Sequence, residues 1–504
     1  MITDLKNELS NTKQLTENGA VGYMTTGKEL LDLNFKTSSL RNKSEDEIFK
    51  LFLKAFHEDK LLAIKWLFFM RDAREGMGER RSFRIILNGL GHQHPTIAKE
   101  LISLVPEYGR WDDLYSLMDG DLTEYVVDFI YQQLQEDCGN YLNKKPISLL
   151  AKWLPKESTK KYKKVYNILL KKFGMTPKKY RRIVSDLRKY LDVVEVKMSA
   201  NEWNKVNYNT IPSKANLLYK DAFLRHDKER RNEYLNDLKN GNNNAKINAK
   251  VLMPHEIVHR YMDKYEWGDI DDFDESLEQL WKALPNYVNS EGFSMFVRDG
   301  SYSMTTKIGN TNITCLDIST ALAIYFSEHC KGEYKDNFIT FSNRPKVIDL
   351  SNCSSLREKI EKCHAEDDCS NTDIYKVFKL ILDTAVNNKY TQEQLPKNIV
   401  VVSDMEFDDA TTTSDYQTLF ETIQAEYLLH GYDLPRLVFW NVCSRTGAIP
   451  LKTNKNGVCL VSGFNPTIMD MVLSGELDPY KCLVNKLNSS RYDAVEKAVK
   501  NLLN

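Results

Sequence analysis

The sequence predicts a multidomain protein in which an N-terminal α-helical solenoid precedes an α/β domain with a doubly wound sheet. Its 504 residues exceed what one ordinary core holds. Apolar residues recur at helical spacing through most of the first 285 residues, and strand-like alternation is scarce there. Short apolar strands then alternate with helical segments, which is typical of a parallel sheet covered by helices. We therefore expect a helical-repeat domain over residues 1–285 and an α/β domain over residues 286–504.

Composition places the chain among ordinary globular proteins. Apolar residues make up 42% of it, charged residues 28%, and the net charge is −1, so the overall charge implies no polyanionic partner. The nine cysteines include no C-x-x-C pair, which favours reduced thiols and a cytoplasmic protein. The polar N-terminus does not resemble a signal peptide, and the longest apolar stretches are too short to cross a membrane.

Capping residues mark helix boundaries in the first domain. Ser44 and Glu47 form a capping-box pattern before an apolar helical run. Thr176 and Pro177 are typical of an N-cap and a first helical position, and Gly174 stands where the preceding helix should end. No clean repeat period is visible, so we expect stacked antiparallel helix pairs with degenerate repeats. The expected helices include IFKLFLKAF, LLAIKWLFFMRDA, RRSFRIILNGL, PTIAKELISLV, RWDDLYSLM and PKKYRRIVSDLRKYL.

The second domain is predicted to alternate strands with helices in a parallel sheet. The expected strands are FSMFVRD, NFITFS, NIVVVSD, LPRLVFWNV and GVCLVSG. The expected helices are LDISTALAIYFSEHC, SSLREKIEKC, IYKVFKLILDTAV, YQTLFETIQAEYLLHG and PTIMDMVLSG.

Polar residues follow the carboxyl ends of these strands, where ligands bind in such sheets. The first strand ends in Asp299-Gly300-Ser301-Tyr302-Ser303, and NIVVV ends in Ser403-Asp404. A later loop contains Ser370-Asn371-Thr372-Asp373. Hydroxyl and carboxylate oxygens suit Mg²⁺, so we expect a magnesium site with a position open to a partner's carboxylate. Arg298, directly before Asp299, makes the charge balance of this site unusual.

The segments DGSYS, the Thr372 loop and VVVSD resemble, in order and spacing, the metal-ion-dependent adhesion site of von Willebrand factor A domains. The resemblance implies that Asp299, Ser301 and Ser303 are metal ligands, and that Thr372 and Asp404 are direct or water-mediated ligands. The alternative is a set of polar strand ends that bind no metal.

Residues 152–189 form the most basic region, with eleven Lys and three Arg against two acids. Such a local surface suits phosphate backbones, and interleaved aromatic residues could stack unpaired bases. The alternative is a solvated helix face. A second basic segment, RDAREGMGERRSFR, could bind phosphate but better fits a tight turn between helices. The candidate RNA-binding residues are Lys152, Lys160, Lys161, Lys163, Lys164, Lys171, Lys172, Lys178, Lys179, Arg181, Arg182 and Arg188.

The stretches RDAREGMGERRSFR, VPEYGRWDDLY, AKWLPKE, the run from YRRIVSDLR to NTIPSKA, and SDMEFDDA resemble the Ro (TROVE) ribonucleoproteins, as does the domain order. In that family HEAT-like helical repeats close into a ring that binds ends of structured or misfolded non-coding RNA. The resemblance implies a non-catalytic, monomeric RNA-binding ring with a magnesium-dependent, partner-binding A domain. An alternative is a protein-interaction scaffold that uses the metal site without RNA.

A third hypothesis, a zinc metalloprotease, comes from His255, Glu256 and His259, which spell H-E-x-x-H. On a helix the two histidines share one face, as zinc ligands do, and the glutamate could act as a general base. The chain shows no continuation that supplies a third histidine; Glu275 and Glu278 are the remaining candidate ligands. A packed pair of histidines is therefore the simpler interpretation.

Overall fold

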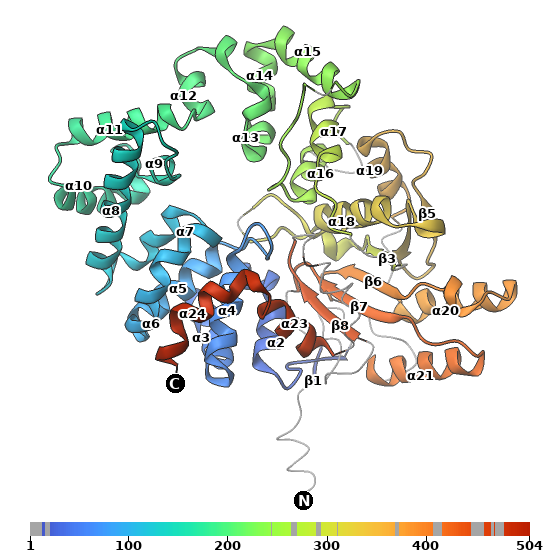
Figure 1. Ribbon diagram of the computed structural model, residues 1–504. Helices are drawn as coiled ribbons and strands as arrows, with labels where there is room; N and C mark the ends of the chain where they lie inside the picture. The colour runs from blue at the N-terminus through green and yellow to red at the C-terminus, as the bar shows by residue number, and fades with distance from the viewer. Residues whose placement is uncertain are drawn as a thin grey trace, which may run out of the picture. The chain divides into compact units, whose positions relative to one another are not determined.

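The computed structural model describes residues 13–15, 21–242, 244–263, 270–288, 294–309, 311–367, 372–406, 416–444, 458–464, 468 and 478–503 (Figure 1). The chain forms two compact units, each built from separated stretches: residues 1–63 with 252–489, and residues 64–251 with 490–504. We call the first the sheet unit and the second the helical unit. The domain boundary near residue 285 stays a prediction.

The helical unit is built from helices joined by short connections. Its longer helices are α4 (Lys60–Arg71), most of which belongs to this unit, α5 (Arg81–Gln93), α8 (Thr123–Leu142), α10 (Lys163–Phe173), α11 (Pro177–Tyr190) and α15 (Lys228–Lys239). Its shorter ones are α6 (Pro95–Leu101), α7 (Val105–Tyr108), α9 (Leu150–Trp153), α12 (Val194–Ser199), α13 (Ser213–Leu218), α14 (Lys220–His226) and α24 (Asp493–Val499), with the 3₁₀ helices η3 (Trp111–Leu117) and η4 (Lys160–Tyr162).

Predicted boundaries in this unit are confirmed where a side chain or a glycine fixes them. Thr176 accepts a hydrogen bond from the Lys179 N–H at 3.3 Å and Pro177 opens α11. Gly174 ends α10 in the left-handed region at φ 58°, where a Cβ would cost strain. The apolar faces of both helices are buried through Tyr166, Phe173 and Tyr180.

The sheet unit contains a six-stranded sheet with the order β5-β4-β3-β6-β7-β8. Its strands are β3 (Ser294–Asp299), β4 (Asn337–Phe341), β5 (Val347–Asp349), β6 (Asn398–Ser403), β7 (Arg436–Asn441) and β8 (Val458–Ser462). All pairings are parallel except that of β5, which runs antiparallel to β4, so the expectation of a purely parallel sheet is wrong at this edge. A short hairpin, β1 (Lys13–Leu15) and β2 (Val21–Tyr23), is separate from it.

Helices of the sheet unit are α2 (Glu29–Phe35), α3 (Glu45–Glu58), α16 (Pro254–Met262), α17 (Glu275–Lys282), α18 (Cys315–His329), α19 (Leu356–Ala365), α20 (Ile374–Asn388), α21 (Tyr416–Leu429) and α23 (Pro479–Leu487). The predicted capping box at Ser44 and Glu47 opens α3. The N-terminal segment packs on the sheet, because the Asn441 amide donates to the Phe35 carbonyl at 2.9 Å. Most of the predicted helix PTIMDMVLSG lies outside the described residues.

In its coarser form the fold prediction is confirmed: a helix-rich region precedes a mixed α/β sheet. Among the described helices, none is both long and apolar enough to span a bilayer.

Candidate functional site

The carboxyl ends of β3 and β6 bring the predicted metal ligands to one edge of the sheet. These strands are parallel neighbours, with Arg298 opposite Val402, so Asp299 and Ser403 come at the same level. The chain leaves β3 toward β4 on one side and leaves β6 toward β7 on the other. This is the topological switch point of the sheet, the place where ligands of such folds bind.

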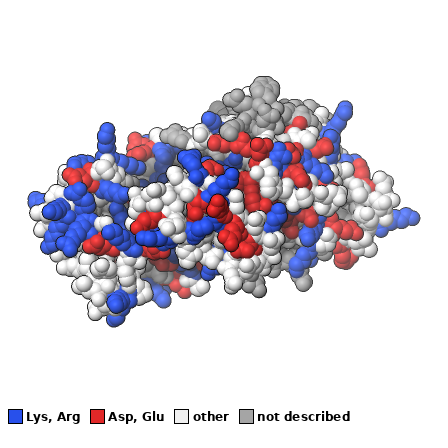
Figure 2. Space-filling view, turned by 90° about the horizontal axis from the view of Figure 1, so that it is seen from above, with Lys and Arg blue, Asp and Glu red and all other residues white. Residues whose placement is uncertain are grey.

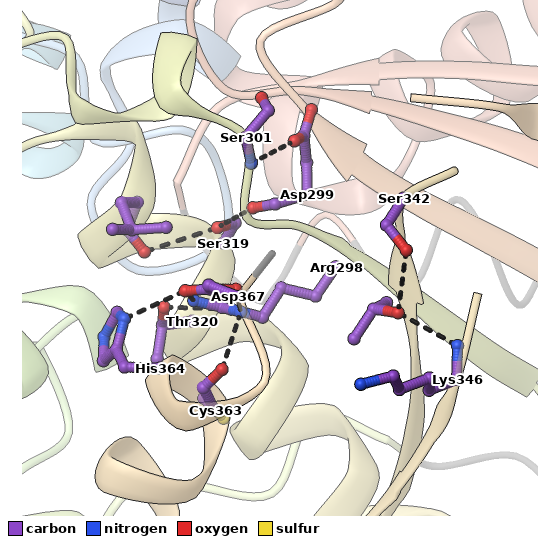
Figure 3. Close-up of polar contacts among 12 residues, drawn as sticks. Arg298, Asp299, Ser301, Ser319, Thr320, Ser342, Lys346, Cys363, His364 and Asp367 are labelled. Carbon is purple, nitrogen blue, oxygen red and sulfur yellow. Dashed lines mark hydrogen bonds and ion pairs between the residues drawn. The ribbon is translucent and has the colours of Figure 1, made fainter. Parts of the chain in front are cut away.

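The Asp299 carboxylate is held by two hydrogen bonds. The Ser403 hydroxyl donates to Oδ2 at 2.5 Å. The Ser301 N–H donates to Oδ1 at 3.0 Å (Figure 3). The Ser301 and Ser303 hydroxyl oxygens lie 3.0 Å apart. Burial raises the pKa of Asp299, although the hydrogen bonds from Ser403 and Ser301 oppose that shift. Asp299, Ser301 and Ser303 are thus brought together as the sequence predicts.

The two remaining predicted ligands are both buried. Asp404 directly follows β6, and its Oδ1 accepts a hydrogen bond from the Glu406 N–H at 3.2 Å. Thr372 precedes Asp373, the N-cap of α20. Ser370 and Asn371, named with it, lie outside the described residues. Since these donors are carboxylates and hydroxyls, the set suits a hard cation such as Mg²⁺.

Arg298 forms an ion pair beside this site that the sequence analysis missed. Its buried guanidinium contacts both carboxylate oxygens of Asp367, at 2.5 and 3.0 Å, and donates to Thr320 Oγ1 at 3.1 Å (Figure 3). Burial alone would raise the pKa of Asp367, but the charge of Arg298 outweighs it and holds that pKa below its usual value. Asp367 therefore neutralises the positive charge of Arg298, so that charge does not have to be balanced by the neighbouring Asp299. The feature of the sequence that could have indicated this ion pair is an arginine inside an otherwise apolar strand.

Gly300 is required for this arrangement. A Cβ on Gly300 would overlap the Asp367 carboxylate and would also crowd Arg298 Nη1 at 3.2 Å. The glycine between Asp299 and Ser301 therefore lets the ion pair lie directly against the backbone of the DGSYS turn.

The predicted RNA-binding residues lie on and around η4, α9, α10 and α11, and most of them are exposed. Figure 2 shows Lys and Arg gathered at the left of the view, the side on which α10 and α11 lie in Figure 1. Among the described residues, eleven of the twelve form no ion pair; Lys172 is the exception, since its ammonium lies 2.6 Å from Asp128 and 3.3 Å from Glu124. Arg188 is held by hydrogen bonds to the carbonyls of Ala151 and Leu154, each at 2.8 Å.

The aromatic residues of this region pack against other side chains and do not form an exposed surface on which bases could stack. Tyr166 and Tyr180 form an edge-to-face pair with ring centroids 5.4 Å apart, and Phe173 stacks on Tyr131 at 5.2 Å. Trp153 lies under the guanidinium of Arg110, 4.1 Å from its ring centroid. The basic surface therefore offers charge without exposed stacking platforms.

The second basic segment has a structural role, as the turn interpretation predicts. Arg71 and Arg84 both contact the buried carboxylate of Asp113, at 2.8 and 2.6 Å. Backbone N–H groups of Met77 and Glu79 donate to the carbonyls of Phe69 and Met70, at 3.0 and 2.8 Å, so the glycine-containing turn caps the end of α4.

The H-E-x-x-H residues also have structural contacts. Glu256 caps the start of α16 by accepting from the Met253 N–H at 3.0 Å, and buried His255 packs edge-on against Phe464. His259 Nδ1 lies 2.9 Å from Asp317, whose charge outweighs the effect of burial and raises the pKa of His259.

The two glutamates considered as a third zinc ligand, Glu275 and Glu278, also form hydrogen bonds within the protein. Glu278 accepts from the Tyr261 hydroxyl and from the Leu356 N–H, and Glu275 accepts from the Gln279 amide. Within the described part of the chain, no three His, Cys, Asp or Glu side chains converge as a zinc site would require.

Comparisons with known proteins give the following similarities. A model of a domain of unknown function, DUF2828, matches residues 16–133 and 170–293, and a model of a second one, DUF7788, matches residues 294–501. An uncharacterized protein of Acanthamoeba polyphaga mimivirus is 28% identical in an alignment that covers 94% of this chain and 86% of that protein. The crystal structure of the Deinococcus radiodurans RO (RSR) protein aligns with a TM-score of 0.37 and 10% identity, over 92% of this chain and 94% of that chain.

Proposed function

We propose that this protein is a non-catalytic RNA-binding protein that contacts phosphates through a basic surface on η4, α10 and α11. The observation that supports it most is that the positive charges of this surface are not neutralised by nearby carboxylates among the described residues. The lysines and arginines of this surface form no ion pair with described residues, whereas Arg71 and Arg84 in the same unit pair with Asp113. We define the basic surface as Lys160, Lys161, Lys163, Lys164, Lys171, Lys178, Lys179, Arg181 and Arg182.

Unpaired surface cations suit a polyanion because lysines and arginines replace the counterions condensed on the phosphates and release those counterions to solution. The buried aromatic rings leave little means of stacking on bases, so contacts to the backbone would dominate and sequence discrimination would be weak. Structured or misfolded non-coding RNA is therefore a better fit than one short sequence. In this proposal the helical repeats form a HEAT-like solenoid that closes into a ring, and a monomer suffices.

Binding should weaken steeply with salt and depend on the basic surface. We expect Lys160, Lys161, Lys163 and Lys164 changed together to Gln to make the log–log salt slope shallower by about 3 to 4 units, since each phosphate contact contributes about 0.9. The measurement is fluorescence anisotropy of a structured RNA with a single-stranded 3′ tail, titrated between low and physiological salt.

A matched control changes four exposed lysines elsewhere, Lys50, Lys54, Lys228 and Lys250, to Gln. It should keep the native slope. A native slope in the first variant, or binding that does not depend on salt, would contradict the proposal. Absence of binding at low salt would favour the second candidate function, a scaffold that acts without RNA.

We further propose that the strand-end site in the sheet unit holds Mg²⁺ and recruits a protein partner. Asp299, Ser301 and Ser303 would be direct ligands, and Thr372 and Asp404 would be direct or water-mediated ligands. The support is the convergence of a buried carboxylate with two hydroxyls at the switch point. When bound, the ion would supply a Lewis-acidic position for a partner's carboxylate, and the chain's own part is to hold these oxygens in place.

Mg²⁺ binding should disappear when Asp299 is changed to Ala, because the variant lacks the carboxylate at the centre of the ligand set. We expect isothermal titration calorimetry to detect one Mg²⁺ per native chain and none in the variant, with RNA binding unchanged. Thr305→Ala is the control, since this exposed hydroxyl on the same turn bonds, among the residues that the structure describes, only to the Tyr302 carbonyl. Undiminished Mg²⁺ binding in the Asp299 variant would refute the site.

A further inference from the structure

The helical unit contains a pocket of about 910 Å³ beside the basic surface. Its walls come from α9, the segment that follows it, Tyr166 of α10, α11, and residues 193–200 around α12. The volume lies within the range of about 300 to 1,000 Å³ typical of sites for small ligands. Arg181 belongs both to this wall and to the basic surface, so a strand bound to that surface can continue into the pocket.

The charge of the pocket lining is positive. Lys152, Lys156, Arg181 and Arg188 face two acids, Glu157 and Glu195, which leaves an excess of two positive charges (four minus two). None of the four cations forms an ion pair with any residue in the described ranges, so their charges are available to a ligand.

Two further contacts prepare the pocket for a polar ligand. The Arg188 guanidinium is fixed because Nε and Nη2 donate to the carbonyls of Ala151 and Leu154, while Nη1 makes no hydrogen bond to the described part of the chain. The Glu195 Oε2 atom is buried and lacks a hydrogen-bond partner among the described residues, although Oε1 accepts from the Tyr219 hydroxyl at 3.3 Å. A buried acceptor of this kind is costly unless a ligand hydroxyl or amino group bonds to it.

We propose that this pocket binds the terminal nucleotide of an RNA through its phosphomonoester; the inference rests on the proposed RNA-binding function and adds a specific subsite to it. A terminal phosphate carries about 1.5 to 2 negative charges at neutral pH, close to the excess charge of the lining, whereas an internal phosphodiester carries one. Arginine donors are arranged to hold phosphate oxygens in pairs. The apolar side chains of Val184, Val193 and Val196 line the same pocket and offer surface for the sugar and base.

The test compares short single-stranded RNAs of one sequence that end in a 5′-phosphate, a 3′-phosphate or hydroxyls only, by fluorescence anisotropy with an internal dye. We expect one phosphorylated RNA to bind about tenfold more tightly than the hydroxyl-ended RNA. Changing Lys152 and Lys156 together to Gln should abolish that preference and leave the affinity for hydroxyl-ended RNA within about twofold. Changing Lys160 and Lys161 to Gln, the matched control, should weaken all three RNAs alike and keep the preference.

Equal binding of all three RNAs would overturn the terminal-phosphate assignment, while salt-steep binding of the hydroxyl-ended RNA would leave the proposed function intact. Free adenosine monophosphate is the competitor that distinguishes a phosphate at the end of an RNA from the phosphate of a free nucleotide. If it binds the native protein but not the Lys152/Lys156 variant, and no RNA end is preferred, the pocket is a site for free nucleotides and the inference is wrong.

Discussion

Changing Asp113 to Ala is expected to destabilise the helical unit by about 3 to 5 kcal/mol, because it leaves buried arginine charge without a partner. The Asp113 side chain is 0% exposed. Its Oδ2 accepts from Arg71 Nε and Nη2, each at 2.8 Å, and its Oδ1 accepts from Arg84 Nε at 2.6 Å. Arg84 keeps a second partner in Asp112, but no other ion pair to Arg71 is present in the described part of the chain.

The surroundings of Asp113 also show why no other group can replace its carboxylate in the variant. A Cβ on Gly109 would lie 2.5 Å from Asp113 Oδ2 and 2.8 Å from Arg71 Nε, so the pair lies directly against the backbone. The Arg110 N–H also donates to Oδ2 at 2.9 Å and would lose this acceptor. Several groups therefore lose a hydrogen bond at once in the variant.

Hydrogen exchange followed by mass spectrometry can locate this loss. We expect peptides from α4 and α5 to exchange about 100-fold faster or more in Asp113→Ala, since each 1.4 kcal/mol changes an opening equilibrium tenfold. Peptides from β3 and β6 should be much less affected. Asp119→Ala is the control, because that aspartate is half exposed and its change should cost less than about 0.5 kcal/mol. A cost below 1 kcal/mol for Asp113→Ala would contradict the assigned role.

Local features of the fold were predictable because neighbouring residues decide them. The cap at Thr176, the turn at Gly174 and the capping box at Ser44 each depend on a few adjacent residues. The strand that ends at Asp299 and the one that ends at Ser403 were also predictable, since continuous apolar runs mark buried strands. Parallel pairing then brings their ends to one edge of the sheet.

Pairings between distant residues were not predictable from these patterns. Arg298 and Asp367 are 69 positions apart, and nothing near Asp367 distinguishes it within a segment of several acids. The aromatic residues between Lys160 and Tyr180 alternate with lysines along the chain, yet helical geometry turns Tyr166 and Tyr180 inward and leaves the lysines outside. The segments 71–84 and 152–188 are both basic, but the structure gives them different surroundings. Asp113 pairs with Arg71 and Arg84 of the first, whereas Lys172 is the one candidate cation of the second with an ion pair to the described residues.

The second large effect is expected from Arg298→Met, which removes a buried charge from the centre of the sheet unit. Arg298 is 0% exposed at its side chain and Asp367 is 11% exposed, so the variant leaves a largely buried carboxylate without its arginine. His364 Nδ1 remains 3.1 Å from that carboxylate, but burial lowers the pKa of this imidazole. We expect a loss of about 3 to 5 kcal/mol in the stability of this unit. Hydrogen exchange in peptides from β3 and α18 measures it, with α4 peptides as the internal reference.

The pH dependence of this loss follows from the pKa of Asp367, which Arg298 holds below its usual value against the opposing effect of burial. A depressed folded-state pKa contributes stability above the unfolded pKa of about 4, and that stability disappears as pH falls through the folded value. The difference between native protein and Arg298→Met should therefore be complete at pH 7 and shrink below pH 4.

The double variant Arg298→Met with Asp367→Leu removes both charges and separates a broken ion pair from lost packing. Because two apolar side chains can replace a buried pair at little cost, we expect the double variant to be more stable than Arg298→Met alone by about 1 kcal/mol or more. If the double variant is less stable than Arg298→Met, the Asp367 carboxylate stabilises the unit even without its arginine, through contacts such as the one between its Oδ2 and His364 Nδ1 at 3.1 Å. In that case the Asp367 carboxylate supports the sheet edge beside Asp299 by hydrogen bonding within the protein, and its ion pair with Arg298 is secondary.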